Sequence, residues 1–310
     1  MRTPWVVGAV LAGVLLAGCG DPRSAPPEPA APRASSPTPA RQPSPARQPA
    51  PAASPSPPAV RAPRVLYLGD SLAMEAQTVL GREMRRELKA RYTSAPYSGT
   101  TLCDYLEGTG ERSLVPAEDK AAALVRRLRP DVVVLQFWGN SWGYTPCMDG
   151  LTYAASRSRY AARYADDARR LTEQIAAAGA GRRPRIVWVA QGPDPLTPDR
   201  VRRVNALYEE RAAVSGDLVA DAGEAVSPAG ARYTWTRYLP CTADERARPG
   251  YCTQPGRGRT ALHRADDPLH FCLAPTTSRP KPCPVPSPGI LRIARAITET
   301  VRHGATRPLQ

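Results

Sequence analysis

Three side chains of the sequence could together carry out nucleophilic catalysis on an acyl group. Ser71 follows a short apolar run and a glycine in VLYLGDS (65–71), and a helical pattern begins after it. His270 lies in ADDPLHFC (265–272), three residues after Asp267. A carboxylate at that offset can hold imidazole Nδ1–H and leave Nε2 to accept the proton of a serine hydroxyl. The activated serine would then form an acyl-enzyme.

Each of these residues also has a simpler role available. Ser71 could be the N-cap of its helix, and Gly-Asp-Ser is common enough to arise by chance. His270 could be a loop histidine fixed by its neighbour Cys272. The chain has three histidines. His263 could be the base instead, although no carboxylate has a comparable offset, and His303 lies in the polar C-terminal tail. The decision depends on the elements that position these residues.

Short apolar runs rich in β-branched residues predict buried strands. They lie at 65–68, 132–137, 186–190 and 218–222, with a weaker strand expected at 90–97. Helical patterns lie at 72–88, 117–128, 159–178, 199–214 and 289–301. This strand–helix alternation predicts an α/β fold, a three-layer α/β/α sandwich with a mostly parallel, doubly wound sheet.

Polar and glycine-containing segments follow the first three expected strands along the chain. They are GDS (69–71), SG (98–99) and WGNS (138–141). Open parallel sheets bind ligands beyond the carboxyl ends of their strands. We therefore expect Ser71, Gly99 and Asn140 to meet at one edge of the sheet, with Gly108 or Gly110 as alternatives to Gly99.

These residues, in this order, resemble the SGNH, or GDSL, hydrolases. The resemblance covers residues 64–301. It implies that Ser71 is the nucleophile, His270 the base and Asp267 the residue that orients the base. It also implies an oxyanion hole formed by the N–H groups of Ser71 and Gly99 and the side chain of Asn140. The family hydrolyses esters or thioesters without a metal or cofactor.

The third block departs from the family pattern Gly-x-Asn-Asp. Trp138 replaces the glycine and Ser141 replaces the aspartate. Asn140 can still donate a hydrogen bond, but it could instead be a turn former beside a glycine. The aromatic residues Trp138, Trp142 and Tyr144 could form a wall for a sugar ring or an acyl chain, or they could pack within their own loop.

The first 63 residues are expected to export and tether the folded domain. Residues 1–19 have one positive charge, an apolar segment too short to span a bilayer and the sequence LAGC. They resemble a bacterial lipoprotein signal peptide with a lipobox, which implies cleavage and lipidation at Cys19; an ordinary secretory signal is the alternative. Residues 20–63 are rich in Pro, Ala and Ser and predict a disordered linker. Residues 64–310 are expected to form the hydrolase domain that the resemblance implies.

The cysteines other than Cys19 are even in number, which is typical of disulfides in an oxidising compartment. Two local pairs stand out, and they leave the other two cysteines to pair with each other. The candidates are therefore Cys241 with Cys252, Cys272 with Cys283, and Cys103 with Cys147. The last bridge would join the loops of Gly99 and Asn140. Closely spaced ligand pairs of zinc sites do not occur, so no metal is expected.

The formal net charge is +14. For an exported protein, anionic lipids or envelope polymers are more available partners than nucleic acid, and a solvated arginine-rich surface is the alternative. The sequence thus predicts a monomeric, lipid-anchored, extracytoplasmic serine esterase that acts on a small or surface-attached acyl ester. An acyltransferase that uses the same triad on a cell-envelope glycan and a non-catalytic binding lipoprotein are the alternatives.

Overall fold

Five parallel strands form the central sheet, in the order β2-β1-β3-β4-β5. The computed structural model describes residues 61–140, 145–276 and 280–305, which belong to the compact unit Pro58–Gln310. The strands are β1 (Arg64–Gly69), β2 (Arg91–Ser94), β3 (Val132–Gln136), β4 (Arg185–Val189) and β5 (Leu218–Ala220). β1 pairs with β2 on one side and with β3 on the other, so the strand order reverses at β1. Parallel sheets bind ligands at such a reversal.

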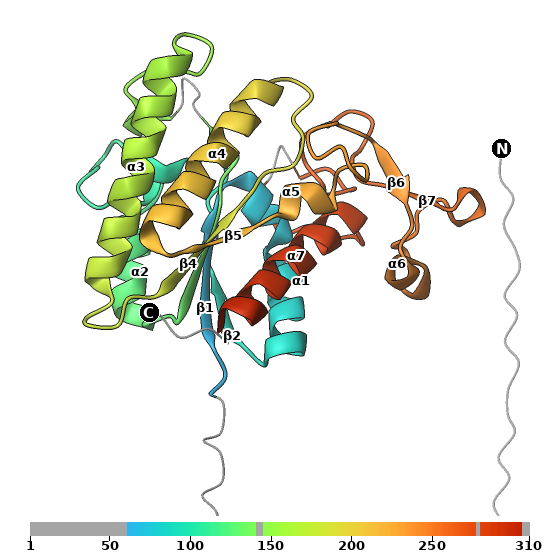
Figure 1. Cartoon of the computed structure of the whole chain (residues 1–310), viewed down its shortest axis with the longest axis horizontal. Coiled ribbons are helices and arrows are strands. Elements are labelled where there is room, and N and C mark those ends of the chain that lie inside the picture. The colour runs from blue at the N-terminus through green and yellow to red at the C-terminus, as the bar shows by residue number, and fades with distance from the viewer. Residues whose placement is uncertain (1–60, 141–144, 277–279, 306–310) are drawn as a thin grey trace, which may run out of the picture. The chain divides into compact units, whose positions relative to one another are not determined.

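Helices cover both faces of this sheet (Figure 1). One layer contains α1 (Ser71–Leu88), the short α5 (Ala222–Ala225) and α7 (Pro288–Ala305). The other contains α2 (Ala121–Leu128), α3 (Arg157–Ala178) and α4 (Pro198–Ser215). The predicted three-layer α/β/α sandwich is therefore confirmed, including the faint edge strand β2.

The strands are buried on both faces, which explains why their apolar runs do not alternate with polar residues. In β1, Val65 and Tyr67 pack with the layer of α1 and α7, whereas Leu66 and Leu68 pack with the layer of α2, α3 and α4. Successive side chains of a strand point to opposite faces, so each strand serves two cores. Together these cores hold the carboxyl ends of β1 and β3 in place.

The helix expected at 117–128 is interrupted at Lys120. A 3₁₀ turn, η2 (Ala117–Asp119), precedes α2, and Lys120 between them has the extended backbone angles φ −60° and ψ 147°. Its ammonium group is buried and donates hydrogen bonds to Asp104 O (2.6 Å) and Thr109 Oγ1 (2.9 Å). These partners lie in a distant loop, so the periodicity of the helix could not reveal the interruption.

The described residues between α5 and α7, 226–276 and 280–287, form an excursion that the sequence did not predict. It contains β6 (Tyr238–Pro240), α6 (Ala243–Ala247), η4 (Pro255–Arg257) and β7 (Arg259–Ala261). β6 and β7 form a two-stranded antiparallel sheet. The Cys241–Cys252 disulfide closes this excursion, and buried Glu245 pairs with Arg292 of α7 at 2.7 Å. Such short strands carry too little periodicity to be recognised.

None of the helices in the described ranges is long and apolar enough to cross a bilayer. The predicted signal peptide with Cys19, and the predicted linker up to residue 60, lie outside the described residues.

Candidate active site

The nucleophile candidate lies at the turn from β1 into α1. Asp70, and not Ser71, is the N-cap of α1, because its carboxylate accepts a hydrogen bond from the Leu72 N–H at 3.0 Å. Gly69 has φ +157°, and a Cβ at this position would lie 2.0 Å from Gln136 O in β3. The glycine thus allows the close approach of β1 to β3. The Ser71 hydroxyl is not needed as a cap and is available for other contacts.

The structure brings Ser71, His270 and Asp267 into one chain of hydrogen bonds. Ser71 Oγ lies 3.0 Å from His270 Nε2, and His270 Nδ1 lies 3.0 Å from Asp267 Oδ2. Asp267 Oδ1 also accepts the backbone N–H groups of Leu269 (3.2 Å) and His270 (3.1 Å). The aspartate therefore fixes both the imidazole and the backbone that carries it. In this arrangement, Nε2 can accept the serine proton.

Several carboxylates set the protonation of His270. Burial alone lowers the pKa of its imidazole. The hydrogen bond with Asp267 and the negative charges of Glu75, Asp267 and Asp70 oppose this effect, so the pKa of His270 is raised overall. Negative charge near the ring favours the imidazolium form that a general base becomes during catalysis.

The other two histidines take no part in this chain of hydrogen bonds. His263 is buried, and its Nδ1 lies 3.0 Å from His270 O. Its ring stacks on Trp235 and contacts Phe271, with centroids 5.6 and 4.5 Å away. Burial lowers the pKa of His263 to about 4, so the ring is neutral and can support the backbone of the base. His303 is exposed on α7 and contacts Glu299.

A cavity of about 240 Å³ opens beside the Ser71 hydroxyl. Its lining includes Ser71, Gly99, Trp138, Asn140 and His270. The glycines considered as alternatives, at 108 and 110, line a different hollow. The structure therefore places the predicted oxyanion residues at one edge of the sheet, together with the predicted base.

The candidate oxyanion donors differ in how they are already engaged. Asn140 Nδ2 donates to Asp70 Oδ2 (3.2 Å) and to Thr100 O (3.0 Å). An amide has two N–H hydrogens, so donation to a substrate oxyanion would require one of these bonds to open. The N–H groups of Ser71 and Gly99 donate to no other group among the described residues. They are the more direct candidates.

Asp70 connects the third loop to the turn of the nucleophile. Its Oδ2 accepts the Trp138 N–H at 2.6 Å in addition to the Asn140 amide. Burial raises the pKa of Asp70 to about 6, although hydrogen bonds from the Trp138 and Leu72 N–H groups and the positive charges of His270 and Arg200 oppose this rise. The sequence did not predict this connection, since Trp138 and Asn140 are 68 and 70 residues away from Asp70.

Trp138 is the one member of the predicted aromatic wall that the structure places. Its ring lines the cavity, and the Arg200 guanidinium lies 4.3 Å from the ring centroid. Arg200 is buried and pairs with Asp194 at 3.2 Å. The indole is thus supported by a fixed cation. The predicted residues Ser141, Trp142 and Tyr144 lie outside the described part of the chain.

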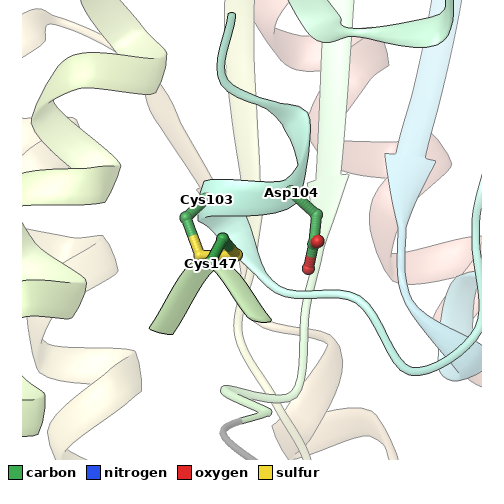
Figure 2. A group of neighbouring side chains, drawn as sticks. All are labelled: Cys103, Asp104 and Cys147. Atoms are coloured by element: carbon green, nitrogen blue, oxygen red, sulfur yellow. A yellow bond between two sulfur atoms is a disulfide. The ribbon is translucent and has the colours of Figure 1, made fainter. Parts of the chain in front are cut away.

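The three predicted cysteine pairs are all present as disulfides. Cys103 lies in η1 (Leu102–Tyr105), just after the Gly99 loop, and Cys147 in η3 (Pro146–Met148), just after the Asn140 loop. Asp104 lies beside them (Figure 2). Because the two sulfurs are bonded to each other, this group offers no thiolate to a metal.

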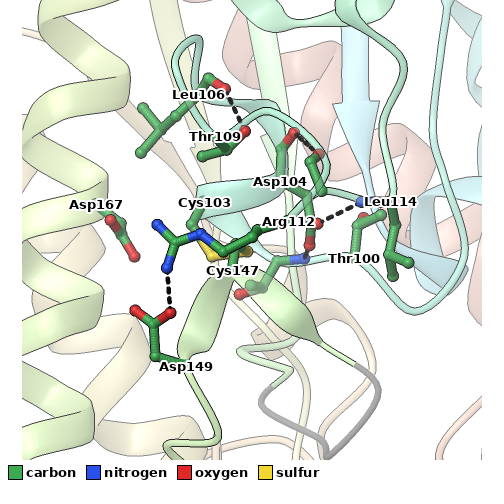
Figure 3. Close-up of a disulfide and its surroundings, with 12 residues drawn as sticks. Thr100, Cys103, Asp104, Leu106, Thr109, Arg112, Leu114, Cys147, Asp149 and Asp167 are labelled. Atoms are coloured by element: carbon green, nitrogen blue, oxygen red, sulfur yellow. Dashed lines mark hydrogen bonds and ion pairs between the residues drawn. A yellow bond between two sulfur atoms is a disulfide. The ribbon is translucent and has the colours of Figure 1, made fainter.

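The disulfide lies in the apolar core, and polar side chains beside it make hydrogen bonds and ion pairs (Figure 3). Asp104 accepts the backbone N–H groups of Thr101 (2.9 Å) and Leu114 (2.8 Å). Asp149, next to η3, pairs with Arg112. These contacts hold the segment that follows the Gly99 loop from two directions, so the disulfide joins two segments that are already ordered.

No protein-family model matches the chain, and no curated protein matches it in sequence. Solved structures match its fold. The periplasmic domain of a lipopolysaccharide acetyltransferase from Salmonella ser. Paratyphi A has 12% identity and a TM-score of 0.49, covering 77% of this chain and 83% of that one. A carbohydrate esterase family 3 protein from Talaromyces cellulolyticus has 14% identity and a TM-score of 0.44, covering 78% and 96%.

A member of the lipolytic protein G-D-S-L family from Veillonella parvula DSM 2008 has 11% identity and a TM-score of 0.40, covering 77% of this chain and 98% of that one. At such low identity these matches concern the fold, and the activity has to be inferred from the residues of the site.

Proposed function

We propose that the protein is a serine esterase that works through an acyl-enzyme. The observation that carries this proposal is the chain of hydrogen bonds from Asp267 through His270 to Ser71, which ends at a cavity. A nucleophile, a base and a residue that orients the base are the elements that acyl transfer requires. A binding protein on the same fold has no need for all three in contact.

The reaction would begin when Ser71 Oγ bonds to the acyl carbon and its proton moves to His270 Nε2. The carbonyl oxygen becomes an oxyanion, which the N–H groups of Ser71 and Gly99 stabilise. Collapse breaks the ester bond, and the leaving alkoxide takes the proton from Nε2. Water then loses a proton to Nε2 and attacks the acyl carbon. The bond to Ser71 Oγ breaks, the acid leaves, and Oγ takes the proton back from Nε2. Asp267 stabilises the imidazolium in both steps.

The protein would act outside the cytoplasm while anchored in the bacterial membrane through lipid on Cys19. The signal-like segment 1–19 and the proline-rich linker support this location. A tethered esterase suits a small or surface-attached acyl ester. Incorporation of labelled palmitate into the wild-type chain, and its loss in Cys19→Ser, would test the anchor.

Hydrolysis of p-nitrophenyl acetate by the full chain and by its Ser71→Ala variant tests the activity. We expect turnover in the wild type and a loss of about 10⁴-fold or more in the variant, with unchanged circular dichroism. Equal turnover in both proteins would overturn the proposal. Product analysis with an added sugar alcohol separates hydrolysis from acyl transfer, because a transferase would give the acylated alcohol in place of the free acid.

A further inference from the structure

Glu75 lies one helical turn after Ser71 on α1, and only 2% of its surface is exposed. Its two carboxylate oxygens accept two consecutive backbone N–H groups of the segment that follows the base: Phe271 N at 2.8 Å and Cys272 N at 3.1 Å. We propose that Glu75 is a second carboxylate serving His270, a positioning residue that holds the base against α1 and stabilises its imidazolium form. This inference rests on the proposed role of His270 as the base.

Burial of a carboxylate is unfavourable, so the presence of a glutamate at position 75 has to be explained by its contacts. Burial raises the pKa of Glu75 to about 7, although the positive charge of His270 and the two backbone hydrogen bonds favour the ionised form. An apolar side chain would avoid this penalty but would leave two buried N–H groups without acceptors. Glutamine offers only one acceptor oxygen, and its NH₂ group would face the other N–H. The contacts therefore select glutamate.

The contacts of Glu75 fix the distance between nucleophile and base. Ser71 and Glu75 are on successive turns of one rigid helix, which contacts the base on one turn and its backbone on the next. The backbone of Glu75 adds a further connection, because the Cys283 N–H donates to Glu75 O at 3.0 Å. Cys283 is joined to Cys272 by a disulfide, so both ends of this bridge are attached to α1 at residue 75.

Charge is the second part of the proposal. The charged and titratable groups that act on His270 and Glu75 come from several elements: Asp70 at the end of β1, Tyr67 in β1, Asp267, His263 and Arg264 in the base segment. Lys281 lines the same cavity. Glu75 and Asp70 both contribute a negative charge from outside the base segment, and Glu75 has the larger effect on His270. Its removal should therefore destabilise the imidazolium without touching Asp267.

Glu83 provides a matched control. It is also a fully buried glutamate of α1, two turns beyond Glu75. Its partners are Arg86 (2.6 Å), Arg248 (3.3 Å) and Arg295 (3.7 Å), and it makes no contact with the base segment. Glu83→Gln thus removes a buried carboxylate from the same helix and affects stability without changing the field at His270.

The decisive measurement is the pKa of His270, obtained by NMR titration of ring-labelled histidine in the full chain. The chain has only three histidines, and the His270→Asn variant assigns the signal. In Glu75→Gln, we expect the pKa of His270 to fall by roughly half a unit to one unit. It should not move in Glu83→Gln, and exposed His303 is an internal reference in every sample. An unchanged His270 pKa in folded Glu75→Gln would overturn the proposal.

Kinetics add a test of position. Glu75→Asp keeps the charge but is one methylene too short to reach both N–H groups, so kcat should fall about tenfold to a hundredfold. Wild-type turnover in folded Glu75→Asp would contradict the positioning role, and this variant carries the test if the glutamine variant does not fold. Absence of esterase activity in the wild type would refute the proposed function, whereas the NMR titration judges Glu75 independently of turnover.

Discussion

On each side of Ser71 a buried carboxylate accepts N–H groups of a neighbouring loop, but the charge that develops during the reaction has opposite sign on the two sides. On the base side, Glu75 accepts the N–H groups of Phe271 and Cys272; on the oxyanion side, Asp70 accepts the Trp138 N–H and the Asn140 amide. Negative charge helps the base side, where an imidazolium forms. It opposes the oxyanion side, where negative charge develops. Glu75 can therefore act through both charge and position. The charge of Asp70 also raises the pKa of His270, but it opposes the oxyanion, so we expect the benefit of Asp70 to come mainly from position.

The largest fall in kcat is expected when the carboxylate that bonds directly to the His270 imidazole is neutralised. Asp267→Asn keeps an oxygen that can accept the Leu269 and His270 N–H groups, but its NH₂ group would face His270 Nδ1. The imidazole would then adopt the wrong tautomer, and kcat should fall by about 10³- to 10⁴-fold. Ester hydrolysis and circular dichroism of the purified variant test this. A fall below tenfold in a folded protein would show that the base does not depend on Asp267.

An intermediate effect is expected for Asp70→Asn on the oxyanion side. Asparagine can still cap α1 through Leu72, but its NH₂ group would face the Trp138 N–H and the Asn140 amide. The third loop should shift, and kcat should fall roughly tenfold to a hundredfold. If the variant instead turns over faster than the wild type, the charge of Asp70 matters more than its position, and the contrast between the two sides is wrong.

A smaller effect is expected when the disulfide on the oxyanion side is removed. Cys103→Ser/Cys147→Ser removes the covalent link between the segments that follow Gly99 and Asn140 and leaves their noncovalent contacts, so kcat of the folded protein should fall about tenfold. Cys241→Ser/Cys252→Ser is the control and should keep wild-type kcat, because neither cysteine is among the described residues that line the cavity.

The two disulfide variants should differ much less in their free energy of unfolding than in kcat. The bridges close loops of 44 and 11 residues, which correspond to losses of about 4 and about 3 kcal/mol. Urea unfolding measures these losses. If kcat falls in both variants in proportion to the loss of unfolding free energy, the Cys103–Cys147 bridge has no special role at the site.

The smallest expected effect is the change of kcat/KM with pH. The pKa of His270 is raised above 6.5, and the neutral imidazole is the active form, so kcat/KM should be lost as the pH falls through that pKa. At pH 6, kcat/KM should be at least about fourfold below its plateau. Removal of a nearby negative charge lowers the pKa and moves this loss to lower pH. Glu75→Gln should move the pH profile further than Asp70→Asn, and the reverse order would contradict the comparison.

The sheet and its large helices could be predicted because each carries its own periodic or apolar signal. The faint strand at 90–97 was needed only to complete the alternation, yet the structure has β2 at Arg91–Ser94, where it pairs with β1. The break at Lys120 could not be predicted, because it depends on acceptors in a loop before it. The excursion of β6 and β7 was also missed, since disulfides and ion pairs, rather than long elements, hold it together.

The site could be predicted where residue types and their order along the chain are sufficient. Ser71, Gly99, Asn140 and the Asp267–His270 pair follow strands or share a turn, so topology brings them together. Glu75 was missed because a glutamate within a helical pattern gives no sign that it is buried. The two N–H groups that donate to its carboxylate belong to residues 196 and 197 positions further along the chain. A polar residue beside the apolar face of α1, one turn after the nucleophile, was the available hint.

The hydrogen bond between Ser71 and His270 joins residues that are 199 positions apart. A ribosome releases the strand, turn and helix of the nucleophile long before the base segment is synthesised. The base then reaches its place only when the base segment docks on α1 through Ser71 and Glu75. Catalytic competence is therefore one of the last properties that the folding chain acquires, and recovery of turnover after refolding should report completion of the whole topology rather than formation of the sheet.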